Sequence, residues 1–306
     1  MGSKFSILIT TFNRLEELKY TLTSLEILIR DGVRIIICDD ASTDGTSAFI
    51  REKYPKIQLL INPVNKGLIY SRNLLMDQVK TPYAISLDDD ANFISPNPFQ
   101  KILEYFKDEP KCGVIAFRIF WGLSKPKITC TYESSQIVKS FVGCAHVWRM
   151  KAWREIPSYP DWYRFYGEEN FASLQLFKKG WGVHYMPSVL VHHRVDNKAR
   201  RKERDYYWRI RRSLRADWYN FMIFYPKSKI IRIFIYSIKN QILKAKRTKD
   251  IKFLKSLFLG IGDLLMNTSR LKKNQNSLTY IEYQKWKELP DAKIYWRPDL
   301  SVTHKE

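Results

Sequence analysis

The sequence predicts an α/β fold with a mostly parallel central sheet, flanking helices and a basic, mostly helical carboxyl-terminal region. Three short apolar runs of β-leaning composition are each followed by a polar turn and then by apolar residues at helical spacing. A fourth apolar run, 83–87, ends in three consecutive carboxylates. Repeated strand, turn and helix units are typical of parallel strands joined by right-handed crossovers.

The length and composition suit a globular α/β protein. The chain has 306 residues, which is enough for one large domain or for a domain with a helical appendage. It contains no run of 18 uncharged apolar residues and enters a strand pattern at once, so we expect no membrane-spanning helix, no signal peptide and a cytoplasmic location. The four cysteines are widely spaced without a Cys-x-x-Cys pair, so we expect reduced thiols.

The first three units can be placed by their periodicity. Apolar residues recur at helical spacing after each polar turn, and Thr11 or Asn13 is placed to cap the first helix. The predicted elements are strand 4–10, helix 14–29, strand 33–38, strand 57–61 and helix 68–79.

The fourth strand leads into the acidic triplet Asp88, Asp89 and Asp90. Ligands bind at the carboxyl ends of strands in open α/β sheets. Adjacent carboxylates repel one another unless a cation or several donors compensate, and extended chain sends Asp88 and Asp90 to the same side. A hard divalent ion, Mg²⁺ or Mn²⁺, meets this need with carboxylate, water and phosphate oxygens. The alternative is a solvated acidic turn or a helix cap.

Polar loops at successive strand ends should converge on one crevice. Asp39 could accept a hydrogen bond from a base or a ribose hydroxyl, and Arg72 could donate to a carbonyl or a phosphate. Asp39 and Asp40 could instead be loop caps, and Arg72 a surface residue. The loops lack the glycine patterns of a Rossmann dinucleotide site and of a P-loop. The converging residues are Thr11, Asp39, Asp40, Asn65, Arg72 and the acidic triplet.

Four ordered motifs resemble the nucleotide-binding half of family 2 inverting glycosyltransferases with the GT-A fold, of the bacterial surface-polysaccharide type. They read ILITTFNR, IIICDDASTDGT, NPVNKGLIYSRN and YAISLDDDAN. The resemblance implies that the triplet is the Asp-x-Asp metal motif, with Asp88 near the ribose and Asp90 on the metal. The implied nucleotide-binding residues are Thr11, Asn13, Arg14, Asp39, Asp40, Asn65, Gly67, Arg72, Asp88 and Asp89.

The acceptor half should follow, over about 96–218. The pattern predicts a helix at 96–107 and strands at 112–121 and 141–149. The second of these strands resembles the family's acceptor-side strand, where a small residue, here Gly143, lets the chain approach the sugar. His146 and Trp148 could line that pocket or belong to the core.

Gly167, Glu168 and Glu169 open a predicted helix within 162–180. Acidic residues in a first helical turn are stabilised by the helix dipole, which is one explanation for the pair. The segment also resembles the family's Gly-Glu-Asp motif, whose last carboxylate deprotonates the acceptor hydroxyl. The resemblance implies Glu169 as the general base, with Glu168 as the alternative.

A strand at 182–191 ends in the pair His192 and His193. Neutral imidazole can complete an oxygen-rich metal site. The family often places a histidine here, and His192 fits the spacing from Pro187 best, so the expected metal ligands are Asp90, Asp88 and His192. A surface pair is the alternative.

The formal net charge of +21 is concentrated near the carboxyl end, where 194–273 holds 23 Lys and Arg against 6 Asp and Glu. A helix at 198–218 is rich in Arg and Tyr, and some of these arginines could face phosphates. Helices at 230–243 and 251–266 are basic and amphipathic, which predicts peripheral contact with an anionic membrane or ordinary helix packing. No motif is interpretable beyond Asn274. We predict a catalytic domain over 1–218, with its nucleotide-binding half at about 1–95, and a basic helical region over 219–306.

The predicted function is metal-dependent transfer of a sugar from a UDP- or dTDP-linked donor to a hydroxyl of a glycan or lipid-linked acceptor. The setting would be surface polysaccharide synthesis, at the inner face of the cytoplasmic membrane. Two alternatives are a nucleic-acid-binding protein that uses the basic region, and a nucleotidyltransferase. Clustered carboxylates would repel a nucleic acid, which makes that partner less favoured. The sugar, the base, the acceptor and the oligomeric state are not predicted.

Overall fold

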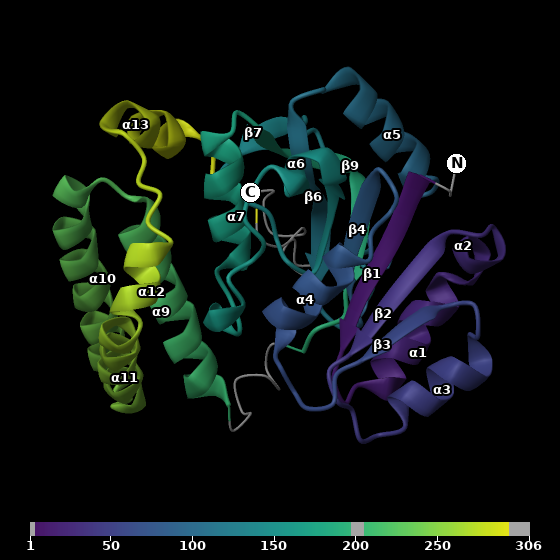
Figure 1. Cartoon of the computed structure of the whole chain (residues 1–306), viewed down its shortest axis with the longest axis horizontal. Coiled ribbons are helices and arrows are strands. Elements are labelled where there is room, and N and C mark those ends of the chain that lie inside the picture. Colours follow the sequence, from purple (N-terminus) through teal and green to yellow (C-terminus); the bar gives the residue numbers. More distant parts are fainter. Residues whose placement is uncertain (1–3, 197–204, 294–306) are drawn as a thin grey trace.

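The first four strands form a parallel half-sheet. The structure, a computed structural model, describes residues 4–196 and 205–293. The half-sheet has the order β3-β2-β1-β4, with Thr11 opposite Asp39 and Thr10 opposite Asp88. The carboxyl ends of these strands therefore meet at one edge, as predicted (Figure 1). The elements are β1 (Phe5–Thr11), α1 (Leu15–Ser24), α2 (Glu26–Arg30), β2 (Arg34–Asp39), α3 (Thr46–Lys53), β3 (Gln58–Ile61), α4 (Leu68–Asp77) and β4 (Tyr83–Asp88).

The second half of the sheet is largely antiparallel. Strand β8 pairs antiparallel with β4 and β6, and β9 pairs antiparallel with β5 and β7, while β6 and β9 are parallel. The predicted α/β fold is confirmed, and the parallel arrangement dominates only its first half. The elements are β5 (Ala91–Phe93), α5 (Pro98–Asp108), β6 (Cys112–Trp121), β7 (Gln136–Val138), β8 (Ala145–Arg149), α6 (Met150–Arg154), a 3-10 helix (Asp161–Tyr163), α7 (Glu168–Lys178) and β9 (Gly182–His193).

Helices cover both faces of the sheet, so its central strands are buried on both sides. In β1, Phe5, Ile7 and Ile9 belong to one hydrophobic cluster, and Leu8 belongs to the other. Alternate residues of a strand point to opposite faces, so a strand buried on both faces reads as a continuous apolar run. This burial explains why the pattern of the first strands is readable in the sequence.

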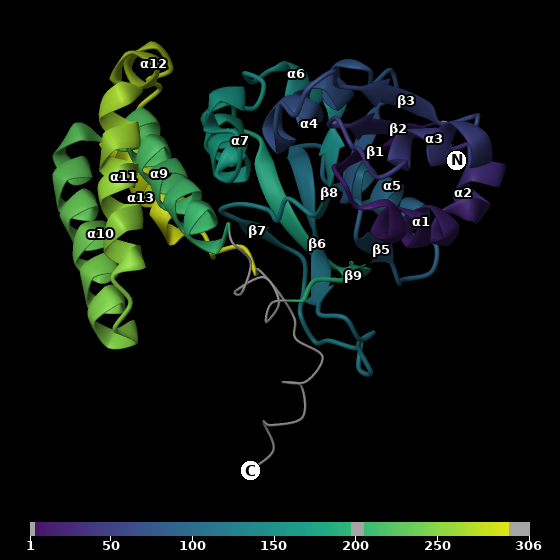
Figure 2. The same cartoon turned by 90° about the horizontal axis from the view of Figure 1, so that it is seen from below.

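The carboxyl-terminal helices pack as a bundle at one end of the molecule (Figures 1 and 2). Leu214, Trp218 and Leu257 form the bundle core, and the missing side chain of Gly260 leaves room for the ring of Trp218. The boundary predicted at 218 falls inside α9, and residues 198–204 of the predicted Arg-rich helix lie outside the described residues. The helices are α9 (Tyr206–Phe224), α10 (Lys227–Thr248), α11 (Lys252–Met266), α12 (Thr268–Lys273) and α13 (Tyr280–Glu288).

Residues 275–293 pack on the part of the chain that contains the sheet. Leu278 and Trp286 are buried in the same cluster as Phe171 of α7. Across residues 4–196 and 205–293, no helix combines the length and the apolar character needed to cross a membrane. The described part of the tail, 275–293, in which no motif was interpretable, therefore belongs to the folded body.

We expect Asp263→Ala to destabilise the docking of α11 on α9. Asp263 is 7% exposed and pairs with Arg211 at 2.5 Å and with Arg215 at 3.4 Å. Removing one partner of a buried ion pair leaves uncompensated charge and costs about 3 kcal/mol. Urea unfolding would measure this loss, and Asp250→Ala, which alters a carboxylate at the exposed α10–α11 turn, should cost much less. Equal losses for both variants would contradict the assignment.

Candidate functional site

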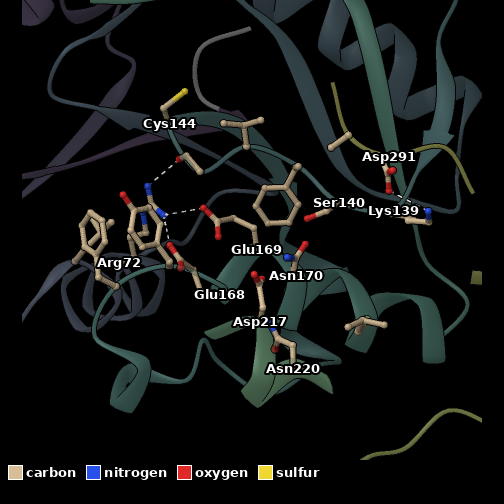
Figure 3. A pocket seen from close by; sticks show the side chains of 18 of the residues that line it. Arg72, Lys139, Ser140, Cys144, Glu168, Glu169, Asn170, Asp217, Asn220 and Asp291 are labelled. Atoms are coloured by element: carbon tan, nitrogen blue, oxygen red, sulfur yellow. Dashed lines mark hydrogen bonds and ion pairs between the residues drawn. The ribbon is translucent and has the colours of Figure 1, made fainter. Parts of the chain in front are cut away.

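Two cavities open at the carboxyl edge of the parallel strands. The strand-edge cavity has a volume of about 430 Å³ and is lined by residues of β1, β4 and the loop before α4. The α7 cavity has a volume of about 580 Å³ and is lined by residues of α7, α9 and the loop before β8 (Figure 3). Leu68, Asp88, Phe165 and Arg209 line both, so the two cavities adjoin.

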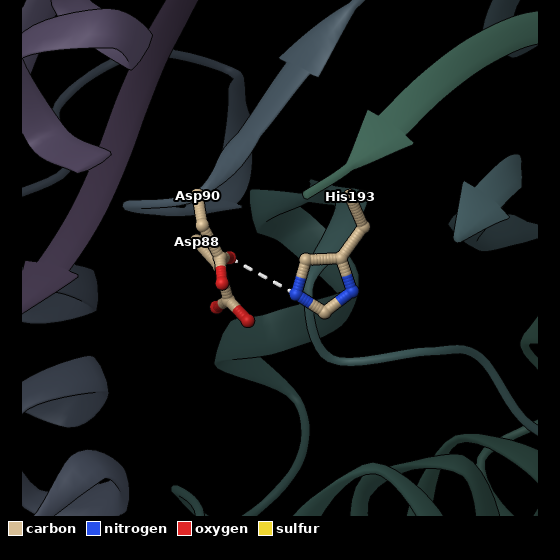
Figure 4. A group of neighbouring side chains, drawn as sticks. All are labelled: Asp88, Asp90 and His193. Carbon is tan, nitrogen blue, oxygen red and sulfur yellow. Dashed lines mark ion pairs between the residues drawn. The ribbon is translucent and has the colours of Figure 1, made fainter. Parts of the chain in front are cut away.

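The acidic triplet lies at the base of the strand-edge cavity. Arg14 contacts Asp89 at 3.0 Å and Asp90 at 2.6 Å, and the Thr11 hydroxyl donates to Asp89 at 2.9 Å. Nε2 of His193 lies 2.9 Å from Asp90 Oδ1 (Figure 4). The Arg14 guanidinium and the His193 ring thus both contact Asp90, which gives the carboxylate the partners that adjacent carboxylates require.

Asp88, Asp90 and His193 offer one ligand atom each within 4.8 Å of one another. Two carboxylate oxygens and an imidazole nitrogen form a donor set that suits Mn²⁺ or Mg²⁺. The residues present therefore fit a divalent cation.

His193, rather than the predicted His192, lies in this group of possible ligands. Nε2 of His192 lies instead 2.7 Å from the carbonyl oxygen of Gly122. Neighbouring residues of a strand point to opposite faces, so an error of one residue in the spacing selects the imidazole ring on the wrong face of β9. The pairing of β9 with β6 jumps from Met186 to Leu190, and this irregularity spoils any spacing counted from Pro187.

Burial and neighbouring charges shift the protonation of this group. Burial raises the pKa of Asp89 to about 7 against the opposing charge of Arg14, and the charges of Asp90 and Asp88 raise it further. Burial lowers the pKa of His193, but the adjacent Cys144 and Asp90 outweigh it and raise the pKa well above its ordinary value. Ligation of a cation would therefore require His193 to release a proton.

Arg72 lines the α7 cavity and bonds to Asp88, which lines both cavities. Its guanidinium is 5% exposed and donates to Glu168 at 2.6 Å, to Asp88 at 3.0 Å and to the Gly143 carbonyl at 2.8 Å. Burial lowers the pKa of Arg72, but the charges of Asp88 and Glu168 outweigh it and raise the pKa. Arg72 was predicted near a base or phosphates, and its two terminal nitrogens are occupied by these protein oxygens.

Glu168 and Glu169 differ in exposure although they are adjacent at the start of α7. The Glu168 side chain is 1% exposed and is held by Arg72, whereas the Glu169 side chain is 21% exposed and lies 4.0 Å from Arg72. Figure 3 shows both carboxylates beside Arg72 at the end of the α7 cavity. Burial and the charge of Glu168 raise the pKa of Glu169 to about 8, against the effect of Arg72. Glu169 is thus the more accessible carboxylate, and its pKa lies near neutrality.

Gly143 allows Arg72 and Glu169 to approach the chain before β8. A Cβ atom at this position would lie 2.3 Å from Oε1 of Glu169 and 2.9 Å from Nη1 of Arg72. The small residue was predicted to make room for a sugar, and in this structure it makes room for the two charged side chains.

Several predicted nucleotide-binding residues hold loops together. Asp39 is fully buried, and its carboxylate accepts from the Ser42 amide at 2.8 Å and from the Ser47 hydroxyl. Asn13 accepts from the Thr43 amide at 2.7 Å. Neither Asp39 nor Asn13 lines the strand-edge cavity, whereas Thr11, Arg14, Asp40, Asn65, Gly67, Asp88, Asp89 and Asp90 do.

Asp40 fixes the loop before α4. Its carboxylate accepts from the Asn62 amide side chain at 2.7 Å and from the backbone amides of Lys66 and Gly67, both at 2.8 Å. A carboxylate that accepts several such bonds stiffens the loop that carries them. Asp40 therefore shapes the cavity wall that contains Asn65 and Gly67.

His146 and Trp148 belong to the core. Nδ1 of His146 lies 3.2 Å from the Val142 carbonyl, and Trp148 donates to the Tyr159 hydroxyl at 3.0 Å. Burial and the charge of Arg72 lower the pKa of His146 well below its ordinary value. Both are fully buried, and neither lines the α7 cavity.

Sequence reasoning did not single out three arginines at the strand-edge cavity. Arg164 precedes α7, and Arg209 and Arg212 lie in α9. Arg164 and Tyr166 both have positive φ, which is a strained conformation for residues with a side chain. The Arg-rich composition of α9 was visible, but which of its arginines face inward depends on how the helix docks.

A family model described as Glycosyl transferase family 2 matches residues 6–159. Among curated proteins, the chain is 32% identical over 112 residues to the poly-beta-1,6-N-acetyl-D-glucosamine synthase of Staphylococcus epidermidis. That match covers 36% of this chain and 27% of the relative. The matched region covers 37% of one curated relative and 27% of the other, so the chain spans only part of their length.

Solved glycosyltransferase structures share the fold. The mannosyltransferase PcManGT from Pyrobaculum calidifontis, in complex with GDP-Man and Mn²⁺, matches with a TM-score of 0.55 and 14% identity, over 92% of this chain and 82% of that chain. GalNAc-T7 with UDP, GalNAc and Mn²⁺ matches with a TM-score of 0.53 and 14% identity, over 63% of this chain and 43% of that chain. The GT-A fold expected from the motifs is confirmed.

We expect Gly143→Ala to disable the site while the protein still folds. The new Cβ must displace Glu169 and Arg72, and overpacking of this kind costs about 1–3 kcal/mol. Release of nucleoside diphosphate from a nucleotide sugar should fall by about 100-fold, as removal of a positioned acid or base does. Gly262→Ala is the matched control, since a Cβ there meets nothing within 4 Å. Unchanged turnover in Gly143→Ala would contradict this role.

Proposed function

Because this chain belongs to glycosyltransferase family 2, we propose that it transfers a sugar from a UDP- or dTDP-linked donor to a hydroxyl group, with inversion at the anomeric carbon. The observation that carries the proposal is the juxtaposition of two cavities that share Asp88, with the Asp88, Asp90 and His193 group where the cavities meet and Glu169 in the α7 cavity. This arrangement supports a donor in the strand-edge cavity and an acceptor in the α7 cavity.

The donor's nucleotide would rest on the loops that line the strand-edge cavity. Thr11, Asp40 and Asn65 border it from three successive strand ends. Arg164 and Arg212 line the same cavity and supply positive charge for a diphosphate. We assign Asp39 and Asn13 to holding these loops in place, since both bond to the turn after β2.

Asp88, Asp90 and His193 would hold Mg²⁺ or Mn²⁺. Such a cation, when bound, supplies Lewis-acid compensation for the charge of a departing diphosphate. Arg14 keeps Asp89 and Asp90 in place through contacts of 3.0 and 2.6 Å. His193 in place of His192 is the metal-ligand assignment that the geometry supports.

Glu169 would act as the general base. The acceptor oxygen forms a bond to the anomeric carbon, its proton passes to the Glu169 carboxylate, and the sugar's bond to the diphosphate breaks. A positioned base contributes about 10²–10⁴ in rate. Glu168, which is buried on Arg72, would position Arg72 and Asp88 rather than take the proton.

We further propose that the acceptor is a glycan or a lipid-linked glycan used in surface polysaccharide synthesis, and that the enzyme works at the inner face of the cytoplasmic membrane. The name of the Staphylococcus epidermidis relative, a polysaccharide synthase, supports this setting. The family assignment leaves the nucleic-acid-binding and nucleotidyltransferase alternatives without support.

We expect metal-dependent nucleotide binding that requires Asp90. Calorimetry with UDP, dTDP and GDP, each with and without Mn²⁺, should detect one nucleotide bound only with the metal. Asp90→Ala should weaken that binding by about 10–100-fold, because it removes a ligand of the proposed cation. Asp77→Ala, a carboxylate at the end of α4 away from the site, is the control. Failure of all three nucleotides to bind under any condition would refute the donor site.

We expect turnover to rise with pH through about 8. A base must be ionised, and the pKa of Glu169 is raised to about 8. A pH profile of turnover should show this limb, and Glu169→Gln should lose it together with about 10²–10⁴ of the rate.

The same shift makes a prediction for stability. A carboxyl whose folded pKa lies above its unfolded value stabilises the fold at low pH and loses that contribution as the pH rises through about 8. Glu169→Gln should therefore be more stable than the wild type above that pH. A Glu168→Gln variant that lost the pH limb, while Glu169→Gln retained it, would reverse the assignment.

A further inference from the structure

Helices α10 and α11 have an inner side that is fully used in packing. Phe234 and Ile238 of α10 and Leu257 and Ile261 of α11 contribute to the bundle core. The apolar stripes predicted for these helices therefore serve mainly for helix packing. Any external contact must use other residues.

A second set of apolar residues lies on the outer side of both helices. Ile231, Ile235 and Ile242 recur along one face of α10. Ile251, the residue before α11, and Phe258 and Leu265 within α11 recur every seven residues. These six side chains, which we name the outer α10–α11 face, are 47–77% exposed. Exposed apolar groups aligned in this way mark an interaction surface more often than scattered ones do.

Positive charge is interleaved with these apolar residues. Lys239 and Lys246 continue the α10 face, and Lys255 lies between the first two apolar residues of the α11 face, all three exposed. Residues 227–279 contain 13 Lys and Arg against two acidic residues, Asp250 and Asp263. Asp263 is buried on Arg211, so Asp250 is the one acidic residue of 227–279 that can offset the outer positive charge, and a large positive excess remains.

A cavity of about 620 Å³ borders the same helix. Lys229, Arg232 and Tyr236 of α10 line it together with Lys287 of α13. Cationic and phenolic groups at this spacing are suited to a phosphate group. In both views the bundle lies at the end of the molecule opposite α2 and α3 (Figures 1 and 2).

From this combination we infer that the outer α10–α11 face docks on an anionic lipid bilayer. Exposed Ile, Phe and Leu enter the boundary between headgroups and acyl chains, while Lys and Arg meet anionic headgroups. A nucleic acid would use the charge but leave the apolar residues in water. A second copy of the chain would bring two faces of the same positive charge together.

Vesicle co-sedimentation of the full chain tests the inference. Vesicles of phosphatidylcholine alone are compared with vesicles of phosphatidylcholine and phosphatidylglycerol at a ratio of about 7:3. We expect binding to the anionic vesicles only, and a fall of about tenfold when salt is raised from about 0.1 to about 0.5 M. Absence of binding to anionic vesicles, or equal binding to both kinds, would overturn the inference.

Two double variants separate the apolar from the charged contribution. Phe258→Ser with Leu265→Ser, and Lys239→Glu with Lys246→Glu, should each weaken vesicle binding by about tenfold or more. Ile27→Ser, at an exposed apolar residue of α2, and Arg51→Glu with Lys56→Glu are the matched controls at the other end of the molecule, and they should bind as the wild type does. Variants indistinguishable from their controls would refute the inference.

Two further measurements decide between occupants. A wild-type dimer that dissociates in the Phe258→Ser and Leu265→Ser variant would assign the face to a second copy instead. Tight binding to duplex DNA that is lost only with the lysine changes would assign it to nucleic acid. The inference extends the proposed function without resting on donor binding, because Asp90→Ala should still sediment with anionic vesicles. Failure of the wild type to bind any of the three nucleotides, together with retained binding to anionic vesicles, would therefore refute the donor site alone.

Discussion

The site depends on the hydrogen bonds and ion pairs made by the buried guanidinium of Arg72. This guanidinium joins Asp88 at the end of a parallel strand, Glu168 at the start of α7 and the Gly143 carbonyl before β8. These groups come from three separate stretches of chain, and carboxylates buried without a partner would be costly. Because one planar cation satisfies all three, the two adjoining cavities keep a fixed relation. Glu169 can stay more exposed because its neighbour Glu168 takes the contact with Arg72.

The acidic triplet divides its charge among different partners. Asp88 faces Arg72, Asp89 faces Arg14 and Thr11, and Asp90 lies between Arg14 and His193. Each carboxylate is thus compensated by protein groups, as adjacent carboxylates require. Burial lowers the pKa of His193, but the neighbouring Cys144 and Asp90 outweigh burial and raise this pKa above its ordinary value.

The sequence was informative wherever a local period or a strand end determined the outcome. Apolar runs identified the parallel strands because these strands are buried on both faces. Of the polar residues predicted to converge at the strand ends, all except Asp39 and Arg72 line the strand-edge cavity. The short strands β5 and β7 have only three residues each, which is too short for a period to show. The structure places His193, and not the predicted His192, beside Asp90, and the pairing of β9 with β6 is irregular before this point. The partners of Arg72 come from elements distant in the chain. Such features depend on tertiary packing, which no local pattern encodes.

The amphipathic helices show how one pattern can serve two purposes. In α11, Leu257 faces the bundle core while Phe258, the next residue, is exposed, so a helix that reads as a single apolar stripe carries two apolar sides. The inner side packs against Leu214 and Trp218 of α9. In the same helix, Asn220 donates to the Gly167 carbonyl and accepts from the Tyr163 hydroxyl. Through these bonds α9 holds the strained loop of Arg164 and Tyr166 and places Arg209 and Arg212 at the strand-edge cavity. A surface that binds the outer side of the bundle would therefore lie one helix away from Arg209 and Arg212. Because α9 carries these two arginines and packs on α10 and α11, a force on the bundle would act on the wall of the strand-edge cavity.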